Sequence, residues 1–174
     1  MARIPYAALD DAGIKPLVDR IVAERGSVLH LYQMLLHSPP VAEGWLNYLT
    51  AIRQKSILDA GLRELVIVQV AFINGARYEA EQHIPIALKA GISQAQIDAL
   101  SAWETSDLFS PMQRRVLALT EEMTRKVHVD KALVEALKGD FNSQELVELI
   151  ATIAAYNMVS RFLEALGIHS DDER

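Results

Sequence analysis

The chain has 174 residues, of which 51% are hydrophobic and 23% charged, and it carries a net charge of −6 and no cysteine. Without cysteine it can form no disulfide bond, thiolate nucleophile, thiolate metal site or peroxide-reducing thiol. The 17 basic residues are scattered along an acidic chain. That pattern argues against nucleic acid and anionic membranes as partners.

The length suits a single domain over 1–174, with an arm over residues 1–12 and a tail over 168–174 at its periphery. The first residues lack the basic start and apolar stretch of a signal peptide, and no apolar run reaches membrane-spanning length. We therefore expect a cytoplasmic protein that does not bind membranes.

Three helices are predicted in the early part of the chain. Apolar residues recur at helical spacing over 14–24, 28–37 and 41–58. The segment Ser38-Pro39-Pro40 separates the second helix from the third, because a residue before proline is pushed out of the helical region. Gly61 is expected to break the third helix from the segment that follows.

The middle of the chain predicts a pair of helices joined by a short break. Residues 62–73 are strongly apolar but lack the two-residue alternation of a strand, so we predict a helix. Asn74-Gly75 marks the break, since glycine takes backbone angles that other residues avoid. A second helix is expected over 76–90, closed by Gly91.

The rest of the chain predicts further helices and no strand. Their starts are marked by capping residues or proline, at Ser93, Pro111, Asp130 and Ser143. The last of these helices is long and ends at Gly167. In total the sequence predicts eight or nine helices in an all-α bundle.

The polar stretch 74–83, between two apolar helices, carries the main candidates for chemistry. Glu79 and His83 are four residues apart and so share one helix face. Imidazole exchanges a proton near neutral pH, and an ionised Glu79 would favour protonated His83, which gives a base beside a general acid. The same spacing also fits a solvated surface pair.

Glu64 is a carboxylate in a segment whose other sides must be mostly buried, so it needs a partner or a site to serve. It can reach His83 only through tertiary packing. The alternative interpretation is that Glu64 accepts hydrogen bonds near the start of its own helix.

Three further residues are candidates for substrate binding. Arg161 interrupts the apolar run 149–166, and we expect it to pair with Glu64 or Glu79 or to anchor a carboxylate. Tyr78 could orient an anionic substrate or lie at the surface. Trp45 belongs to a set of aromatic residues at core-like positions, some of which could line a pocket.

No metal-ligand spacing, phosphate-binding glycine loop or dinucleotide fingerprint is found in the sequence. A site without metal or cofactor is therefore the simplest catalytic interpretation.

These residues resemble the carboxymuconolactone decarboxylase family, which also contains the AhpD-like alkylhydroperoxidases. The likeness covers roughly residues 35–166. Its central part consists of Arg63-Glu64-Leu65, Tyr78-Glu79, His83, Ala87 and Gly91-Ile92-Ser93, and the flanking parts are His37-Ser38-Pro39 and the segment from Tyr156 to Phe162.

The resemblance implies an all-helical fold, assembly into a homotrimer or homohexamer, and a site near subunit contacts. The hydroperoxidase branch uses a Cys-x-x-Cys pair before a histidine, with a glutamate upstream. By position, the glutamate matches Glu64, the histidine matches His83, and the cysteine positions fall on Ala76 and Glu79. The proton-handling groups are thus present, and the redox groups are absent.

The resemblance therefore predicts a cofactor-free decarboxylase or lyase that acts on a small carboxylated lactone or keto acid by general acid/base chemistry. His83 would donate the proton, Glu79 would hold and tune His83, and Glu64 would complete the relay. Two alternatives remain: a hydroperoxidase-like member without redox cysteines, and a non-catalytic small-molecule binder or oligomeric scaffold.

Overall fold

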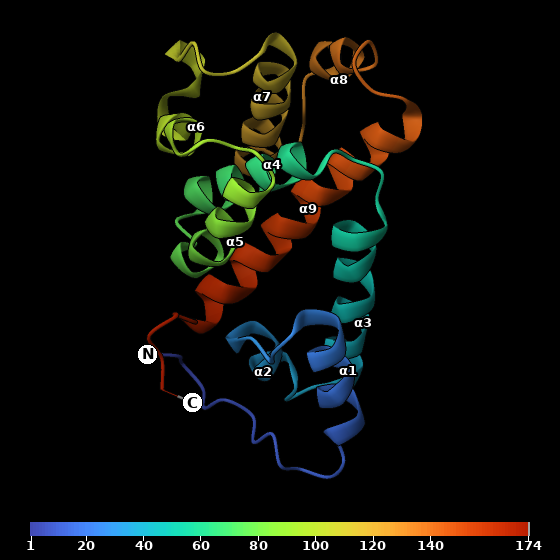
Figure 1. The fold of residues 1–174 in the computed structure, drawn as a ribbon, viewed down its shortest axis with the longest axis vertical. Helices are drawn as coiled ribbons and strands as arrows, with labels where there is room; N and C mark the ends of the chain where they lie inside the picture. The colour runs from blue at the N-terminus through green and yellow to red at the C-terminus, as the bar shows by residue number, and fades with distance from the viewer. Residues whose placement is uncertain (174) are drawn as a thin grey trace. The chain divides into compact units, whose positions relative to one another are not determined.

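A computed structural model describes residues 1–173 and confirms the all-α fold, with nine α-helices and no strand in that range (Figure 1). The α-helices are α1 (Lys15–Arg25), α2 (His30–Leu35), α3 (Pro39–Thr50), α4 (Ala60–Asn74), α5 (Arg77–Lys89), α6 (Gln94–Ala99), α7 (Pro111–Arg125), α8 (Lys131–Leu137) and α9 (Ser143–Leu166). A π-helical segment, Ala51–Lys55, follows α3, and a 3-10 segment, Leu100–Thr105, follows α6.

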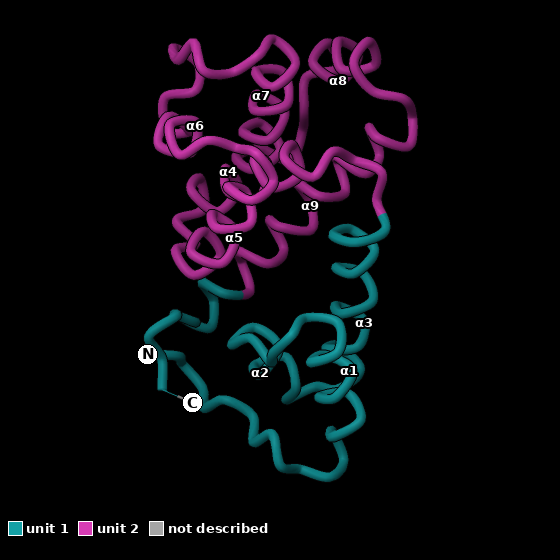
Figure 2. The backbone as a smooth tube through the Cα atoms, in the orientation of Figure 1, with its two compact units in different colours: residues 1–55, 163–174 teal, residues 56–162 magenta. Residues whose placement is uncertain are grey.

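Figure 2 shows the chain as two compact units. The first contains residues 1–55 and 163–174, and the second contains residues 56–162. Each unit is described below by itself.

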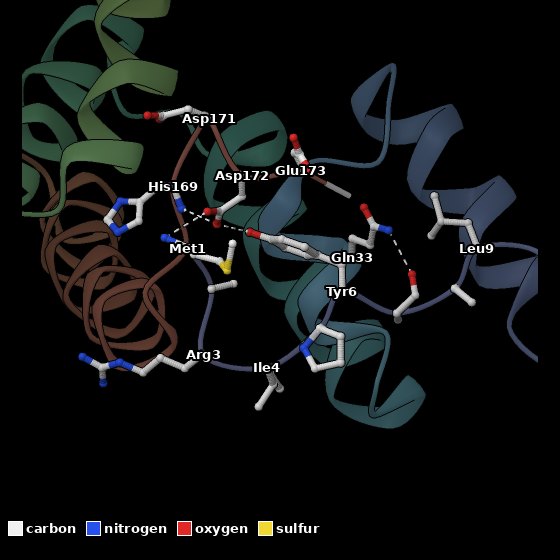
Figure 3. Close-up of a pocket in the computed structure, with 14 residues that line it drawn as sticks. Met1, Arg3, Ile4, Tyr6, Leu9, Gln33, His169, Asp171, Asp172 and Glu173 are labelled. Atoms are coloured by element: carbon white, nitrogen blue, oxygen red, sulfur yellow. Dashed lines mark hydrogen bonds and ion pairs between the residues drawn. The ribbon is translucent and has the colours of Figure 1, made fainter.

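In the first unit, the N-terminal arm is tied to the end of the chain. The backbone N–H of Arg3 donates to the carbonyl of Leu166 at 2.8 Å. Figure 3 shows Tyr6 pointing at Asp172, to which its hydroxyl donates at 2.7 Å. Residues of the arm and the tail line a pocket of about 1040 Å³ in this unit. Trp45 lies half-buried on α3, also in the first unit.

The second unit is organised around α4, which packs against both α5 and α7. Nearly every side chain of α4 between Gly61 and Ala71 is buried, as the apolar sequence predicts. Gly61 lies inside α4 and does not break a helix, so that expectation was wrong. A Cβ at Gly61 would come within 2.9 Å of the backbone oxygen of Ala90, and glycine therefore permits a close approach of α4 to the end of α5.

The predicted helix boundaries follow from local hydrogen bonds. Ser93 and Ser110 form capping boxes with the glutamines three residues later, and Asp130 accepts from the backbone of Ala132. Gly75 ends α4 with φ of 67°, a left-handed conformation that suits glycine.

By length and composition α9 could cross a membrane, but 56% of its most apolar window is buried inside the protein. A core helix passes the same test, and α9 has this character: Leu149 and Ile153 are fully buried. The structure is that of a soluble helical domain.

Candidate functional site

The α4–α5 hairpin places Glu64 and His83 against each other. The turn at Gly75 reverses the chain, and the close approach at Gly61 brings the first half of α4 beside the second half of α5. Glu64 Oε2 and His83 Nδ1 are consequently 2.7 Å apart although 19 residues separate them in sequence. The sequence indicated both residues as candidates, and their pairing depends on this helix packing.

The pair is almost sealed from solvent. The Glu64 side chain is 1% exposed, and the His83 side chain is 9% exposed. The other carboxylate oxygen, Oε1, lies 3.5 Å from Nε of Arg63, whose positive charge offsets the cost of burying a carboxylate. A charge-assisted hydrogen bond in such a setting fixes the orientation and tautomer of the imidazole.

Helix α9 closes the site from another side. The Tyr156 ring meets the His83 ring edge-on, with centroids 4.9 Å apart and an interplanar angle of 87°. One turn further along, the Ser160 hydroxyl donates to Glu79 Oε2 at 3.0 Å. Glu79 and His83 are four residues apart on α5, and they contact two residues of α9 that are also four apart. This matched spacing is expected for helices packed side by side (Figure 1).

Glu79 is 2% exposed, so the solvated surface pair considered from its spacing to His83 is not what the structure contains. His83 Nδ1 is hydrogen-bonded to Glu64 Oε2 and not to Glu79, and the Ser160 hydroxyl donates to Glu79. Glu64, Glu79, His83, Tyr156 and Ser160 are hereafter called the His83 cluster.

Sequence reasoning missed two members of this cluster. Ser160 lacks the sequence context of a catalytic serine, and it acts as a hydrogen-bond donor to a buried carboxylate instead. Tyr156 was noted as the first residue of the segment 156–162 that resembles the family. The available signal was their spacing of four within the apolar run of α9, which matches the spacing of Glu79 and His83 on α5.

The two positions that match cysteines in the hydroperoxidase branch have other environments. Ala76 is fully buried and packs with Ala71 and Ala80 in a small apolar cluster. Glu79 is held by Ser160. An apolar contact and a buried carboxylate therefore stand where that branch has its thiols.

The three substrate-binding candidates have separate environments. Tyr78 is buried on α5, 3% exposed, while Trp45 belongs to the first unit. Arg161 donates to the carbonyl and the side-chain oxygen of Asn157 and forms no ion pair with Glu64 or Glu79. The pairing with Glu64 or Glu79 is therefore not found, because Arg161 directly follows Ser160 and consecutive helix residues point about 100° apart. The alternative, that Arg161 anchors a carboxylate, stays a prediction.

Within residues 1–173, no group of three or more His, Asp or Glu side chains is arranged to hold a metal ion.

Residues 39–122 match the model of the carboxymuconolactone decarboxylase family. Two bacterial proteins are similar in sequence. The uncharacterized protein YdfG of Bacillus subtilis (strain 168) is 27% identical over 116 residues, 66% of this chain and 79% of that protein. The uncharacterized protein YnjA of Escherichia coli (strain K12) is 32% identical over 127 residues, 72% of this chain and 66% of that protein.

Among solved structures, an uncharacterized peroxidase-related protein from Ralstonia eutropha JMP134, described as an alkylhydroperoxidase AhpD core, superposes with a TM-score of 0.82. The match covers 98% of this chain and 93% of that one, at 21% identity, and so establishes the fold. Residues 39–122, which include the Glu64–His83 pair, therefore belong to the carboxymuconolactone decarboxylase family, in a cysteine-free chain with an AhpD-like fold.

Proposed function

We propose that this protein is a cofactor-free carboxy-lyase acting on a small carboxylated lactone or keto acid. The observation that supports the proposal is the buried hydrogen bond between Glu64 Oε2 and His83 Nδ1, at 2.7 Å. It is an acid/base pair of the kind that proton-transfer enzymes use, in a chain that belongs to the family over residues 39–122.

In the proposed reaction, the bond between the substrate carbon and its carboxylate breaks and carbon dioxide leaves. The electron pair moves into the adjacent conjugated carbonyl and gives an enolate. His83 then donates a proton to the enolate carbon, and water restores the proton to the imidazole. The sum is one carboxylate and one proton converted into carbon dioxide and a C–H bond.

Each member of the pair has a role that follows from its exposure. Nδ1 is engaged by Glu64, so proton transfer to the substrate would take place at Nε2 of His83. Glu64 is more deeply buried than His83 and is proposed as the positioning residue that holds the imidazole. Glu79, fixed by Ser160, is proposed to tune the electrostatics of the cluster.

The fold alone does not determine the chemistry, because one fold carries many functions. The chain supplies no thiol, so the proposal uses only proton transfer. A homotrimer or homohexamer, a location in the cytoplasm and the absence of nucleic-acid and membrane partners stay predictions from the sequence and the resemblance.

The test is carbon dioxide release from carboxymuconolactone and a panel of small unsaturated lactone acids and keto acids. We expect turnover by the wild type and a loss of about 100-fold or more in kcat with His83→Ala. The matched control is His128→Ala, which removes an exposed histidine outside the cluster. Circular dichroism would verify that each variant is folded.

Two results would contradict the proposal in different ways. Equal turnover by wild type and His83→Ala would remove His83 from the chemistry. An absence of carbon dioxide release from every acid in the panel would remove the carboxy-lyase assignment and favour the non-catalytic binder.

A further inference from the structure

A second polar site lies in the second unit, in a pocket of about 270 Å³ at the end of α7. Its walls are the last residues of α7, the loop that follows and one face of α9. Part of the lining is apolar, from Met123, Val127, Val129 and Ala154. Val127 is 93% exposed, an unusual state for a large apolar side chain at a pocket wall.

The polar side of this pocket is built around Arg161. Its Nη1 donates to the carbonyl oxygen of Asn157 at 3.0 Å and to the side-chain oxygen of Asn157 at 2.7 Å. Asn157 is 8% exposed and is itself fixed, because its amide group donates to Thr124 Oγ1 and to the carbonyl of Ile153, both at 3.0 Å. Asn74 donates to the same Asn157 oxygen at 3.1 Å.

This network determines which way the Asn157 amide points. The Thr124 hydroxyl donates to the carbonyl of Thr120 at 2.6 Å, so Thr124 Oγ1 accepts from Asn157. The oxygen of Asn157 is thereby directed to Arg161. The guanidinium is thus positioned by buried neutral groups that hold one of its nitrogens and leave its charge uncompensated.

The other two cations of the pocket are already neutralised. Arg125 pairs with Glu121 at 2.8 Å, and Lys126 pairs with Glu122 at 3.1 Å. For Arg161, no carboxylate among residues 1–173 lies within ion-pair distance. Its Nε and Nη2, the edge of a guanidinium that binds a carboxylate with two parallel hydrogen bonds, make no hydrogen bond to that part of the chain.

This pocket is distinct from the His83 cluster. Asn157 directly follows Tyr156 in the chain, and Arg161 directly follows Ser160. Consecutive side chains on a helix point about 100° apart, so Asn157 and Arg161 point away from the cluster. The cluster takes one face of the helix, and the pocket takes another.

We propose that this pocket binds a small carboxylic acid, with its carboxylate on Nε and Nη2 of Arg161 and a short apolar body against Met123 and Val127. One uncompensated guanidinium matches one negative charge. The apolar lining and the volume, slightly below that of most ligand pockets, fit a body of a few carbons. The inference stands independently of the carboxy-lyase proposal.

Calorimetric titration of the full chain with butyrate tests the proposal. Butyramide, which has the same shape without the charge, and inorganic phosphate serve as comparison ligands. We expect butyrate to bind in the millimolar range or tighter, and butyramide and phosphate to bind at least about tenfold more weakly. No binding of butyrate, or equal binding of either comparison ligand, would overturn the proposal.

Three variants locate the site. Arg161→Gln is expected to weaken butyrate binding about tenfold or more, whereas Arg125→Gln, which removes a cation already paired with Glu121, should change it about twofold or less. Asn157→Asp would supply Arg161 with an internal carboxylate and so compete with the ligand while the arginine is retained.

Binding by Arg161→Gln equal to the wild type would remove Arg161 from the site. His83→Ala should bind butyrate like the wild type, and a matching loss there would show that the two sites are one. Melting temperatures of all variants distinguish a lost contact from a lost fold. Failure of carbon dioxide release would leave these binding results unaffected, so the two proposals fail separately.

Discussion

Two buried carboxylates, one in each unit, differ in whether their hydrogen-bond partners can gain and lose a proton near neutral pH. Glu64 in the second unit faces the titratable imidazole of His83, on a helix adjacent in the chain. Asp172 in the first unit, with a side chain 4% exposed, accepts from the Tyr6 hydroxyl at 2.7 Å and from the backbone N–H of His169 at 3.0 Å. These partners of Asp172 keep their protons at neutral pH.

The pKa of Asp172 shows the effect of such partners. Burial acts to raise this pKa, but the hydrogen bonds from His169 and Tyr6, together with the N-terminal ammonium group, outweigh burial and lower the pKa to about 2. Asp172 is thus ionised at neutral pH, and its hydrogen bonds and ion pair link the N-terminal arm to the C-terminal tail. Glu64 has a partner that can gain and lose a proton, which suits chemistry. The identity of the partner, more than burial, distinguishes the carboxylate of Asp172 from that of Glu64.

The largest effect on stability is expected from Glu64→Ala. It removes the buried carboxylate to which His83 Nδ1 is hydrogen-bonded, and we expect the free energy of unfolding to fall by about 2 to 4 kcal/mol. Urea denaturation of Glu64→Ala, His83→Ala and the double variant measures this. The double variant should lose less than the sum of the single losses, and additivity within about 0.5 kcal/mol would contradict the pairing.

A smaller effect is expected from Gly61→Ala, which tests the close approach that brings Glu64 to His83. The added methyl group would lie 2.9 Å from the oxygen of Ala90, so we expect a loss of about 1 to 3 kcal/mol in the free energy of unfolding. Gly44→Ala is the matched control, because a Cβ there meets nothing within 4 Å and alanine favours the helix. Equal stability changes for the two variants would refute the packing argument.

The smallest effect is expected from Asp172→Asn, and it depends on pH. Because the folded pKa is depressed, the contribution of Asp172 is fully present above the unfolded value near 4 and disappears as the pH falls through about 2. We expect a loss of about 1 to 2 kcal/mol at pH 7 that shrinks steadily below pH 4. Urea denaturation at pH 7, 4 and 2.5 measures it.

Asp171→Asn, an exposed neighbour in the same tail, serves as the control for Asp172→Asn and should change little at any of these pH values. A deficit of Asp172→Asn that is the same at pH 7 and at pH 2.5 would contradict a depressed pKa.

The sequence predicted the helices of this fold because their signals are local. Apolar spacing, capping serines and the glycine at position 75 depend on residues a few positions apart. The structure has nine α-helices within residues 1–173, where eight or nine were predicted, and it confirms the break between α4 and α5. The role of Gly61 was not predictable in this way. It depends on the carbonyl of Ala90, 29 positions later in the chain, which reaches Gly61 only in the folded protein.

The candidate site shows the same limit. The chemistry of Glu64, Glu79 and His83 was visible in the residue types, and the structure buries all three. Which carboxylate bonds to the imidazole, and the contribution of Tyr156 and Ser160 from α9, follow from tertiary packing. The sequence left open whether Arg161 pairs with Glu64 or Glu79 or anchors a carboxylate, because spacing in an apolar run does not reveal the helix face that a neighbouring residue occupies.

The residues at the start of α5 determine how sensitive the site is to oxidants and other thiol-modifying reagents. With a packed alanine at position 76 and a hydrogen-bonded carboxylate at position 79, the site offers no thiol for peroxide, nitric oxide or thiol-alkylating reagents to modify. Its output should therefore be indifferent to the thiol–disulfide balance of its compartment, and preparations handled in air should match those kept under dithiothreitol.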